Sequence, residues 1–231
     1  MIMSGNTLDR RQVEQMVRQV LHSRLQPDIS QTYRPPSDNS GPNPLVVNVS
    51  ARHAHVTQQD LEVLFGPEAK LTKLRDLYQQ GEFASEQTVN IVGPRSRMIP
   101  NIRILGPCRE YTQVELSYTD GIFLGLKLPL RISGNHENTP GCVMVGLAGA
   151  LTLPRGLIRA ERHVHMHPDD AAHYAVHDAG YMQLHIVGPC GLKFDRVKVR
   201  INPRVKLEVH IDTDEGNACD LASATRMELI K

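Results

Sequence analysis

The sequence predicts a mostly β protein whose body consists of two homologous small β-barrels with helical caps and inserts. From Pro44 onward, short runs of β-forming residues are separated by Gly and Pro, and several alternate apolar and polar residues. The same sequence features occur twice in the same order, which indicates an internal repeat. A third feature precedes the body: an amphipathic N-terminal segment followed by a polar stretch.

The composition limits the classes of function. A chain of 231 residues with 40% hydrophobic residues is long enough for one large domain or two small ones. A net charge of +1, few aromatic residues and no Trp argue against a nucleic-acid partner. No run approaches the roughly 20 apolar residues of a membrane helix, and the N-terminus lacks the apolar core of a secretory signal. Four widely spaced cysteines contain no Cys-x-x-Cys pair. We therefore expect a soluble cytoplasmic protein with reduced thiols.

Residues 7–25 are expected to form an amphipathic helix, since apolar side chains recur at intervals of three and four: Val13, Met16, Val17, Val20 and Leu21. The polar, Pro-rich stretch that follows predicts an extended linker over residues 28–44. A helix held away from the body cannot easily bury its apolar stripe there, so residues 1–27 are a candidate docking peptide. The alternatives are a helix that folds back on the body and a membrane-surface helix, although large aromatics are missing from its apolar face.

The elements of the body follow from their local patterns. Strands are expected at LVVNVS, TVNIVG, NIRILG, QVELSY, MQLHIVG, RVKVRI and VKLEVHI. One helical region is expected from Asp60 to Tyr78, broken near Gly66, with a capping-box spacing that begins at Thr57. Another is expected from Asp169 to Asp178, with Pro168 at its first position and Gly180 after its end.

The repeat is centred on two short motifs, Arg52-His53-Ala54-His55 and Arg162-His163-Val164-His165. Two histidines at positions i and i+2 of extended chain point to the same side. A second repeated motif, Ile-Val-Gly-Pro, occurs at residues 91–94 and 186–189. The distance from Gly93 to Glu115 is 22 residues, as is that from Gly188 to His210. Glu115 and His210 are therefore expected at equivalent positions in the two halves.

Each half then offers three metal-ligating side chains: His53, His55 and Glu115 in the first, and His163, His165 and His210 in the second. Three nitrogen or carboxylate ligands leave a coordination position free, which is typical of a catalytic zinc rather than a structural one. Such a ligand set also suits other divalent metals. The alternative is that Glu115 is an exposed strand residue and His210 a core histidine.

Other candidates are less specific. Arg109, shortly before Glu115, has a guanidinium suited to bidentate phosphate binding, although most surface arginines have no such role. Arg200, Arg204 and Lys206 are expected on the solvated face of a strand, or as a basic flank for a phosphorylated cofactor. The Gly- and Pro-rich stretch over residues 121–156 is either the lining of a ligand cleft or a plain connector.

The segments SARHAHVT, RHVHMHPDDA, RILGPCREYTQVELS and VHIDTDEGNA resemble the PduL-type phosphate propanoyltransferases, the phosphotransacylases of bacterial microcompartments. The resemblance implies two helix-capped β-barrels, over residues 45–160 and 161–231, with residues 45–50 completing the second barrel. It implies two zinc ions per chain, bound by the two ligand sets above. It also implies that Arg109 faces the phosphate and that Ser133 lies near the substrate.

The implied reaction moves an acyl group reversibly between coenzyme A and inorganic phosphate. Propanoyl is the default acyl group, as in propanediol degradation, with acetyl or another short chain as alternatives. The resemblance further implies a location in the microcompartment lumen, with residues 1–27 as an encapsulation peptide that binds shell or cargo proteins. Homo-oligomers are also conceivable. Two other functions are compatible with the ligand set: a zinc-dependent thioesterase or phosphatase, and a non-catalytic, zinc-stabilised shell-associated protein.

Overall fold

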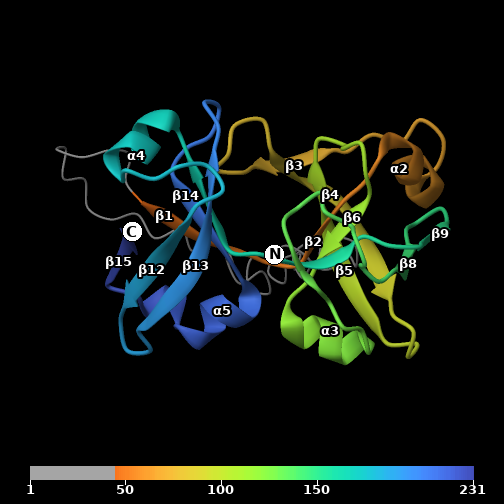
Figure 1. The fold of residues 1–231 in the computed structure, drawn as a ribbon. Coiled ribbons are helices and arrows are strands. Elements are labelled where there is room, and N and C mark those ends of the chain that lie inside the picture. The colour runs from red at the N-terminus through yellow and green to blue at the C-terminus, as the bar shows by residue number, and fades with distance from the viewer. Residues whose placement is uncertain (1–44) are drawn as a thin grey trace, which may run out of the picture. The chain divides into compact units, whose positions relative to one another are not determined.

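A computed structural model describes residues 45–231, which all belong to one compact unit. The predicted N-terminal helix and linker, residues 1–44, lie outside the described residues. Two curled β-sheets with few helices make up the described part of the chain (Figure 1). The prediction of a mostly β body is thus confirmed.

The first sheet has nine strands and contains the first His-x-His motif. Its order is β7-β10-β6-β2-β5-β4-β8-β9, and β3 pairs with β4 off this path. The strands are β2 (His53–His55), β3 (Lys73–Asp76), β4 (Phe83–Val92), β5 (Met98–Gly106), β6 (Gln113–Glu115), β7 (Leu130–Arg131), β8 (Cys142–Val145), β9 (Ala150–Leu153) and β10 (Leu157–Ala160).

The second sheet has six strands and contains the second motif. Its order is β1-β14-β11-β13-β12-β15. The strands are β1 (Val46–Ser50), β11 (His163–Met166), β12 (Tyr181–Val187), β13 (Leu192–Ile201), β14 (Glu208–Asp212) and β15 (Arg226–Ile230).

The two sheets repeat the same pairings. The Ile-Val-Gly-Pro motifs begin in the last two residues of β4 and β12, and each of these strands pairs antiparallel with the next, β5 or β13. In each half the histidine strand, β2 or β11, pairs parallel with that next strand. On its other side it pairs antiparallel with the strand that carries the third candidate ligand, β6 or β14. The internal repeat read from the sequence therefore corresponds to a repeated strand arrangement.

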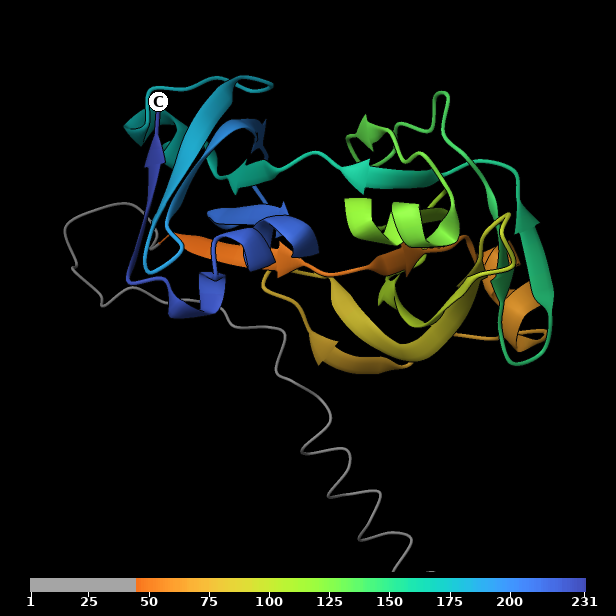
Figure 2. The same cartoon turned by 90° about the horizontal axis from the view of Figure 1, so that it is seen from below.

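The halves exchange one strand each. β1, just before the first histidine pair, joins the second sheet by pairing with β14. β10, just before the second pair, joins the first sheet by pairing with β6. Residues 51–52 and 161–162 are the short segments that cross between the sheets, and they run between the two halves in Figure 2. Each histidine pair thus begins at a crossing.

Each sheet has one face covered by its own hydrophobic core. Ala54 is fully buried in the first core and Val164 in the second, together with Val114 and Val209 from the neighbouring strands. Because side chains alternate along a strand, burial of Ala54 and Val164 directs the flanking histidines to the opposite face. The core side of each sheet thereby fixes the side on which the candidate ligands stand.

The helices differ from the sequence expectation in several places. α2 (Gln58–Phe65) begins at the Thr57 cap and ends before Gly66, where a break was predicted, but Lys73–Asp76 is strand β3. The expected helix from Asp60 to Tyr78 is therefore wrong beyond Phe65. α4 (Pro168–His173) has Pro at its start as predicted and is shorter than expected.

Two helices and one 3₁₀ turn were not predicted. α3 (Tyr118–Leu124) and α5 (Thr213–Ala218) follow the two third-ligand strands, and each begins with a capping box, Ser117 with Asp120 or Asp212 with Glu215. The strand expected to reach Tyr118 ends at Glu115. The 3₁₀ turn spans Leu221–Ser223. No helix among residues 45–231 is long and apolar enough to span a membrane.

Candidate metal centre

Strand pairing brings the three candidate ligands of each half together. Glu115 lies directly opposite His53 across β2 and β6, and His210 lies directly opposite His163 across β11 and β14. Directly paired residues share a face of the sheet, and the second histidine of each pair stands on that face two residues further on. Both predicted triplets are therefore assembled by backbone register.

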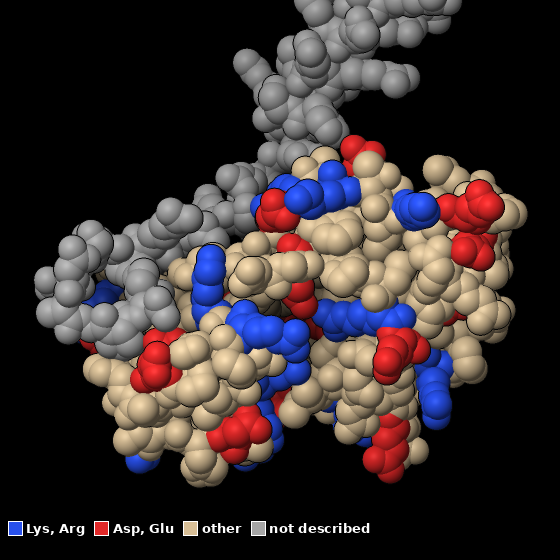
Figure 3. Space-filling view, turned by 90° about the horizontal axis from the view of Figure 1, so that it is seen from above, with Lys and Arg blue, Asp and Glu red and all other residues tan. Residues whose placement is uncertain are grey.

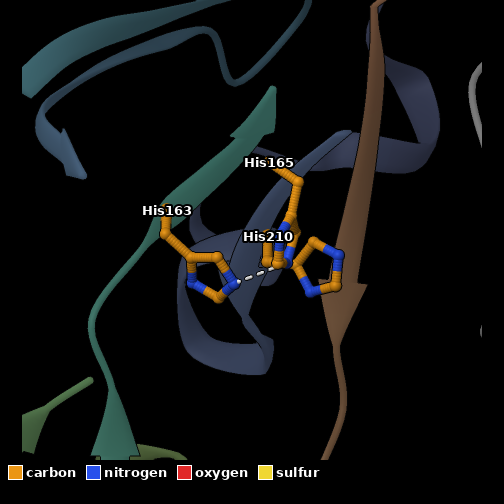
Figure 4. Close-up of side chains that lie close together, drawn as sticks. All are labelled: His163, His165 and His210. Carbon is orange, nitrogen blue, oxygen red and sulfur yellow. Dashed lines mark hydrogen bonds between the residues drawn. The ribbon is translucent and has the colours of Figure 1, made fainter. Parts of the chain in front are cut away.

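The side chains converge as well. In each triplet, one potential ligand atom from every residue lies within 4.8 Å of the others. His53 Nε2 is 3.6 Å from Glu115 Oε2 in the first cluster. His163 Nε2 is 3.2 Å from His165 Nε2 in the second, where the three rings point toward one another (Figure 4). Distances of this size are those expected between ligands of one small cation.

The crossing segments orient the first histidine of each pair. Nδ1 of His53 lies 2.8 Å from the carbonyl oxygen of Ala51, and Nδ1 of His163 lies 2.9 Å from that of Glu161. A carbonyl can only accept, so Nδ1 carries the proton and Nε2 keeps its lone pair for a metal. The same device occurs in both halves because both histidines follow a crossing.

Burial keeps three of the histidines neutral. It lowers the pKa of His55 to about 2, with further contributions from His53 and Arg109. It lowers the pKa of His165 to about 3, assisted by His210 and Arg200, and that of His163 well below its ordinary value. Neutral imidazole is the form that binds metals, so these side chains are ready to ligate at neutral pH. Burial acts in the same sense on His210, but the adjacent Glu208 carboxylate raises its pKa overall.

Among the described residues, the buried Nδ1 of His55 has no hydrogen-bond partner. An unsatisfied buried polar atom is costly, and a bound cation is one way to satisfy it. In the second cluster, Nε2 of His210 lies 3.0 Å from Oε2 of the Glu208 carboxylate. The residues present therefore fit a divalent metal in each half, and their N and O donors suit zinc.

Arg109 and Ser133 adjoin the first cluster and contact each other. Arg109 Nη1 donates to Ser133 Oγ at 3.3 Å, and Nη2 contacts Glu82 Oε1 at 3.2 Å. Ser133 Oγ also accepts from Gln113 Nε2 at 2.8 Å. Ser133 follows β7, within the stretch over residues 121–156, which contributes three strands to the nine-stranded sheet and is not a plain connector.

The two clusters share a pocket. It is lined by one ligand of the first cluster, Glu115, and two of the second, His163 and His210, together with Glu161 of the second crossing and Ser50 at the end of β1. On the face seen in Figure 3, Lys and Arg side chains border a hollow that has acidic side chains inside it. A ligand in the pocket would therefore contact both halves.

Sequence reasoning missed several polar residues of this region. Gln113 and Glu208 lie opposite His55 and His165, two residues before the third candidate ligand of each half. That i−2 position on a strand is a signal that would have found them. Gln79 and Glu82 lie between β3 and β4, outside the repeated motifs, and carry no such signal. Arg200, expected on a solvated face, lies opposite His165.

Comparisons with known proteins show which family the chain belongs to. A family model described as phosphate propanoyltransferase matches residues 46–222. A phosphate propanoyltransferase of Planctopirus limnophila is 53% identical over the whole chain and 94% of its own length. Those of Thermotoga maritima and Salmonella typhimurium are 44% and 43% identical over 81% and 82% of this chain, and 89% and 90% of their own. The chain therefore belongs to the phosphate propanoyltransferase family and is an acyltransferase.

Proposed function

We propose that this chain transfers an acyl group reversibly between coenzyme A and inorganic phosphate at a centre of two zinc ions, one per ligand cluster. The observation that carries the proposal is the pair of three-ligand clusters, of which Glu115, His163 and His210 line one pocket, with Arg109 beside the first cluster. Propanoyl is the default acyl group, from the name of the relatives.

Bound zinc would supply charge that polarises a thioester carbonyl and neutralises a phosphate oxygen, and a free coordination position leaves room for either. His53, His55 and Glu115 would hold the first ion, and His163, His165 and His210 the second. Glu115 makes the first set more negative than the second, so the two ions differ in charge environment and need not have the same role.

Arg109 would hold the phosphate. Its guanidinium already contacts one carboxylate and one hydroxyl, Glu82 and Ser133, so it is oriented before a substrate arrives. Phosphate carries more charge than a single carboxylate and matches the guanidinium fork in geometry. Ser133 is connected to the ligand Glu115 through Gln113, which would couple the phosphate position to the first cluster.

The transfer needs no covalent enzyme intermediate. A phosphate oxygen forms a bond to the thioester carbonyl carbon, the C–S bond breaks, and coenzyme A leaves as a thiolate that takes up a proton. Cys108, next to Arg109, is an unsuitable acyl carrier because burial raises the pKa of its thiol and so keeps it protonated.

The test measures coenzyme A release from propanoyl-CoA with and without phosphate, using zinc-loaded and chelator-stripped protein. We expect about two zinc ions per chain by elemental analysis, release that requires phosphate, and formation of propanoyl phosphate. Release without phosphate, with free propanoate as product, would instead establish the zinc-dependent hydrolase. Full activity in protein that contains no divalent metal would refute the zinc centre.

We also propose that the enzyme works in the lumen of a bacterial microcompartment. Support comes from the sequence of residues 1–27, whose apolar stripe suits docking on a shell or cargo protein. The same apolar stripe, if it is not covered by a partner, would favour self-association of the chain into homo-oligomers.

A further inference from the structure

Both halves carry a buried polar residue at the same position, two residues before the third candidate ligand. Gln113 is fully buried and Glu208 is 2% exposed. Gln113 lies opposite His55, and Glu208 lies opposite His165, so each stands on the sheet face of its own cluster. The position is the same in both halves, but the chemistry differs.

In the first half the position is filled by an amide. Gln113 Nε2 donates to Glu115 Oε1 at 2.7 Å and to Ser133 Oγ at 2.8 Å. Gln113 Oε1 accepts from the backbone nitrogen of Gly134 at 2.8 Å and lies 2.9 Å from His136 Nε2. Because the Gly134 N–H can only donate, the amide cannot flip without losing this bond. Its donors therefore stay directed at the carboxylate of Glu115.

In the second half the position is filled by a carboxylate. Glu208 Oε2 lies 3.0 Å from His210 Nε2, within reach of an N–H on that nitrogen. The other partners of Glu208 hold it in place: Gln79 Nε2 donates to Oε2 at 2.5 Å, and the amide of Asn48 donates to Oε1. The carboxylate is thus fixed beside the imidazole by two residues from the first half of the chain, Gln79 between β3 and β4 and Asn48 on β1.

We propose that Gln113 and Glu208 are equivalent positioning residues, each of which sets the third ligand of its own zinc site. The inference rests on the proposed two-zinc function. The partner matches the ligand in both cases: an amide donor stands beside a carboxylate ligand, and a carboxylate acceptor stands beside an imidazole ligand. Partners of this kind orient metal ligands, and their loss commonly weakens metal affinity about 10- to 100-fold. A polar residue that served the fold alone would not need to match the ligand.

The test titrates metal-free full-length protein with zinc against a chromophoric chelator. Two backgrounds isolate the sites, because His165→Ala removes a ligand of the second cluster and His55→Ala one of the first. In the His165→Ala background, we expect Gln113→Met to weaken zinc binding at the first site about 10- to 100-fold. In the His55→Ala background, it should leave zinc binding at the second site unchanged. Glu208→Gln should show the reverse selectivity. Gln87→Glu and Glu228→Gln, on the same sheets away from the clusters, are the controls.

A compensating pair tests the match directly and does not depend on Gln113→Met folding well. Glu115→His combined with Gln113→Glu gives the first half the pairing found in the second. We expect this double variant to bind zinc at the first site about 10-fold tighter than Glu115→His alone. The zinc affinity of the first site should thus depend on the residue at position 113. The melting temperature of the metal-free protein should be nearly the same for Glu115→His with and without Gln113→Glu.

The outcomes separate the two proposals. If the parent protein takes up no zinc, the zinc centre itself is wrong. If the parent binds two ions and the variants bind both as tightly, the positioning role is wrong. Equal weakening of both sites by each variant, with no benefit from the compensating pair, would also overturn it, because that pattern indicates a general structural effect.

Discussion

Arg109 is the residue whose chemistry separates phosphate transfer from simple metal binding. We expect Arg109→Ala to reduce phosphate-dependent release of coenzyme A at least about 100-fold, since it removes a charged, oriented donor. Arg109→Lys should also be poor, because an ammonium cannot replace the two-pronged contact of the guanidinium with Ser133 and Glu82. Steady-state kinetics with varied phosphate provide the measurement.

Zinc content and melting temperature should stay near those of the parent enzyme in both Arg109 variants. Arg95→Ala is the matched control, since Arg95 is exposed on the turn between β4 and β5. Near-normal turnover in Arg109→Ala would show that another group binds the phosphate.

The six candidate ligands could be predicted from the sequence because they belong to a repeat with fixed spacing. The contacts of Arg109 with Ser133 and Glu82 could not, since these three residues come from different segments that meet only when the nine-stranded sheet closes. Gln113 and Glu208 were missed for another reason: a lone Gln or Glu on a strand has no motif, and its role depends on what stands opposite.

At the scale of elements, an ion pair in each half ties the histidine strand to the helix after the third-ligand strand. Arg52, just before β2, contacts Asp120 of α3 at 3.2 Å. Arg162, just before β11, contacts Glu215 of α5 through Nε at 2.7 Å and Nη2 at 2.5 Å. Asp120 and Glu215 are also the capping-box acids of these helices. Each pair therefore fixes two of the strands that carry candidate ligands.

We expect Arg162→Ala to lower the free energy of unfolding by about 1–2 kcal/mol, because it removes the ion pair with Glu215 and the hydrogen bonds that Arg162 donates to Glu215 and to the carbonyl oxygen of Asp195 at a partly buried site. Arg52→Ala should cost less, since its side chain is 45% exposed and makes a single contact. Arg226→Ala, which removes an exposed pair with Glu228, is the control and should change stability by less than about 0.5 kcal/mol. Urea unfolding of metal-free protein measures the free energy of unfolding of all three variants. Equal losses in the three variants would contradict the idea that the more buried ion pair contributes more to stability.

The prediction of helices and strands succeeded where a cap residue marked the start of a helix, and it failed where the residue pattern was compatible with both a helix and a strand. Thr57 and Pro168 marked the starts of α2 and α4 correctly. The helix expected to run to Tyr78 was wrong because its polar residues pair with β4 as strand β3. α3 was missed because its capping box follows a short strand almost directly, so the apolar pattern suggested a strand that reaches Tyr118.

At the scale of the molecule, the strand exchange makes each sheet depend on the other half. β1 supplies an edge strand to the second sheet and β10 pairs with β6 in the first, and Gln79 of the first half contacts Glu208 of the second. The sequence predicted two related halves from their repeat. Apart from the family resemblance, which placed residues 45–50 in the second barrel, it held no sign of the exchange, since an apolar strand before each histidine pair fits either sheet.

Residues 1–27 are expected to direct the enzyme to a shell without contributing to catalysis. Their removal should leave turnover nearly unchanged, since no candidate ligand lies in this segment, and should yield a smaller oligomer by light scattering because an apolar stripe is lost. A fluorescent protein that carries only residues 1–27 should co-localise with shells. Val17→Asp or Leu21→Asp should abolish this by placing a charge in the stripe, whereas Gln15→Asp on the polar face should not. Shell recovery of the truncated enzyme together with a diffuse fusion protein would show that the address lies elsewhere in the chain.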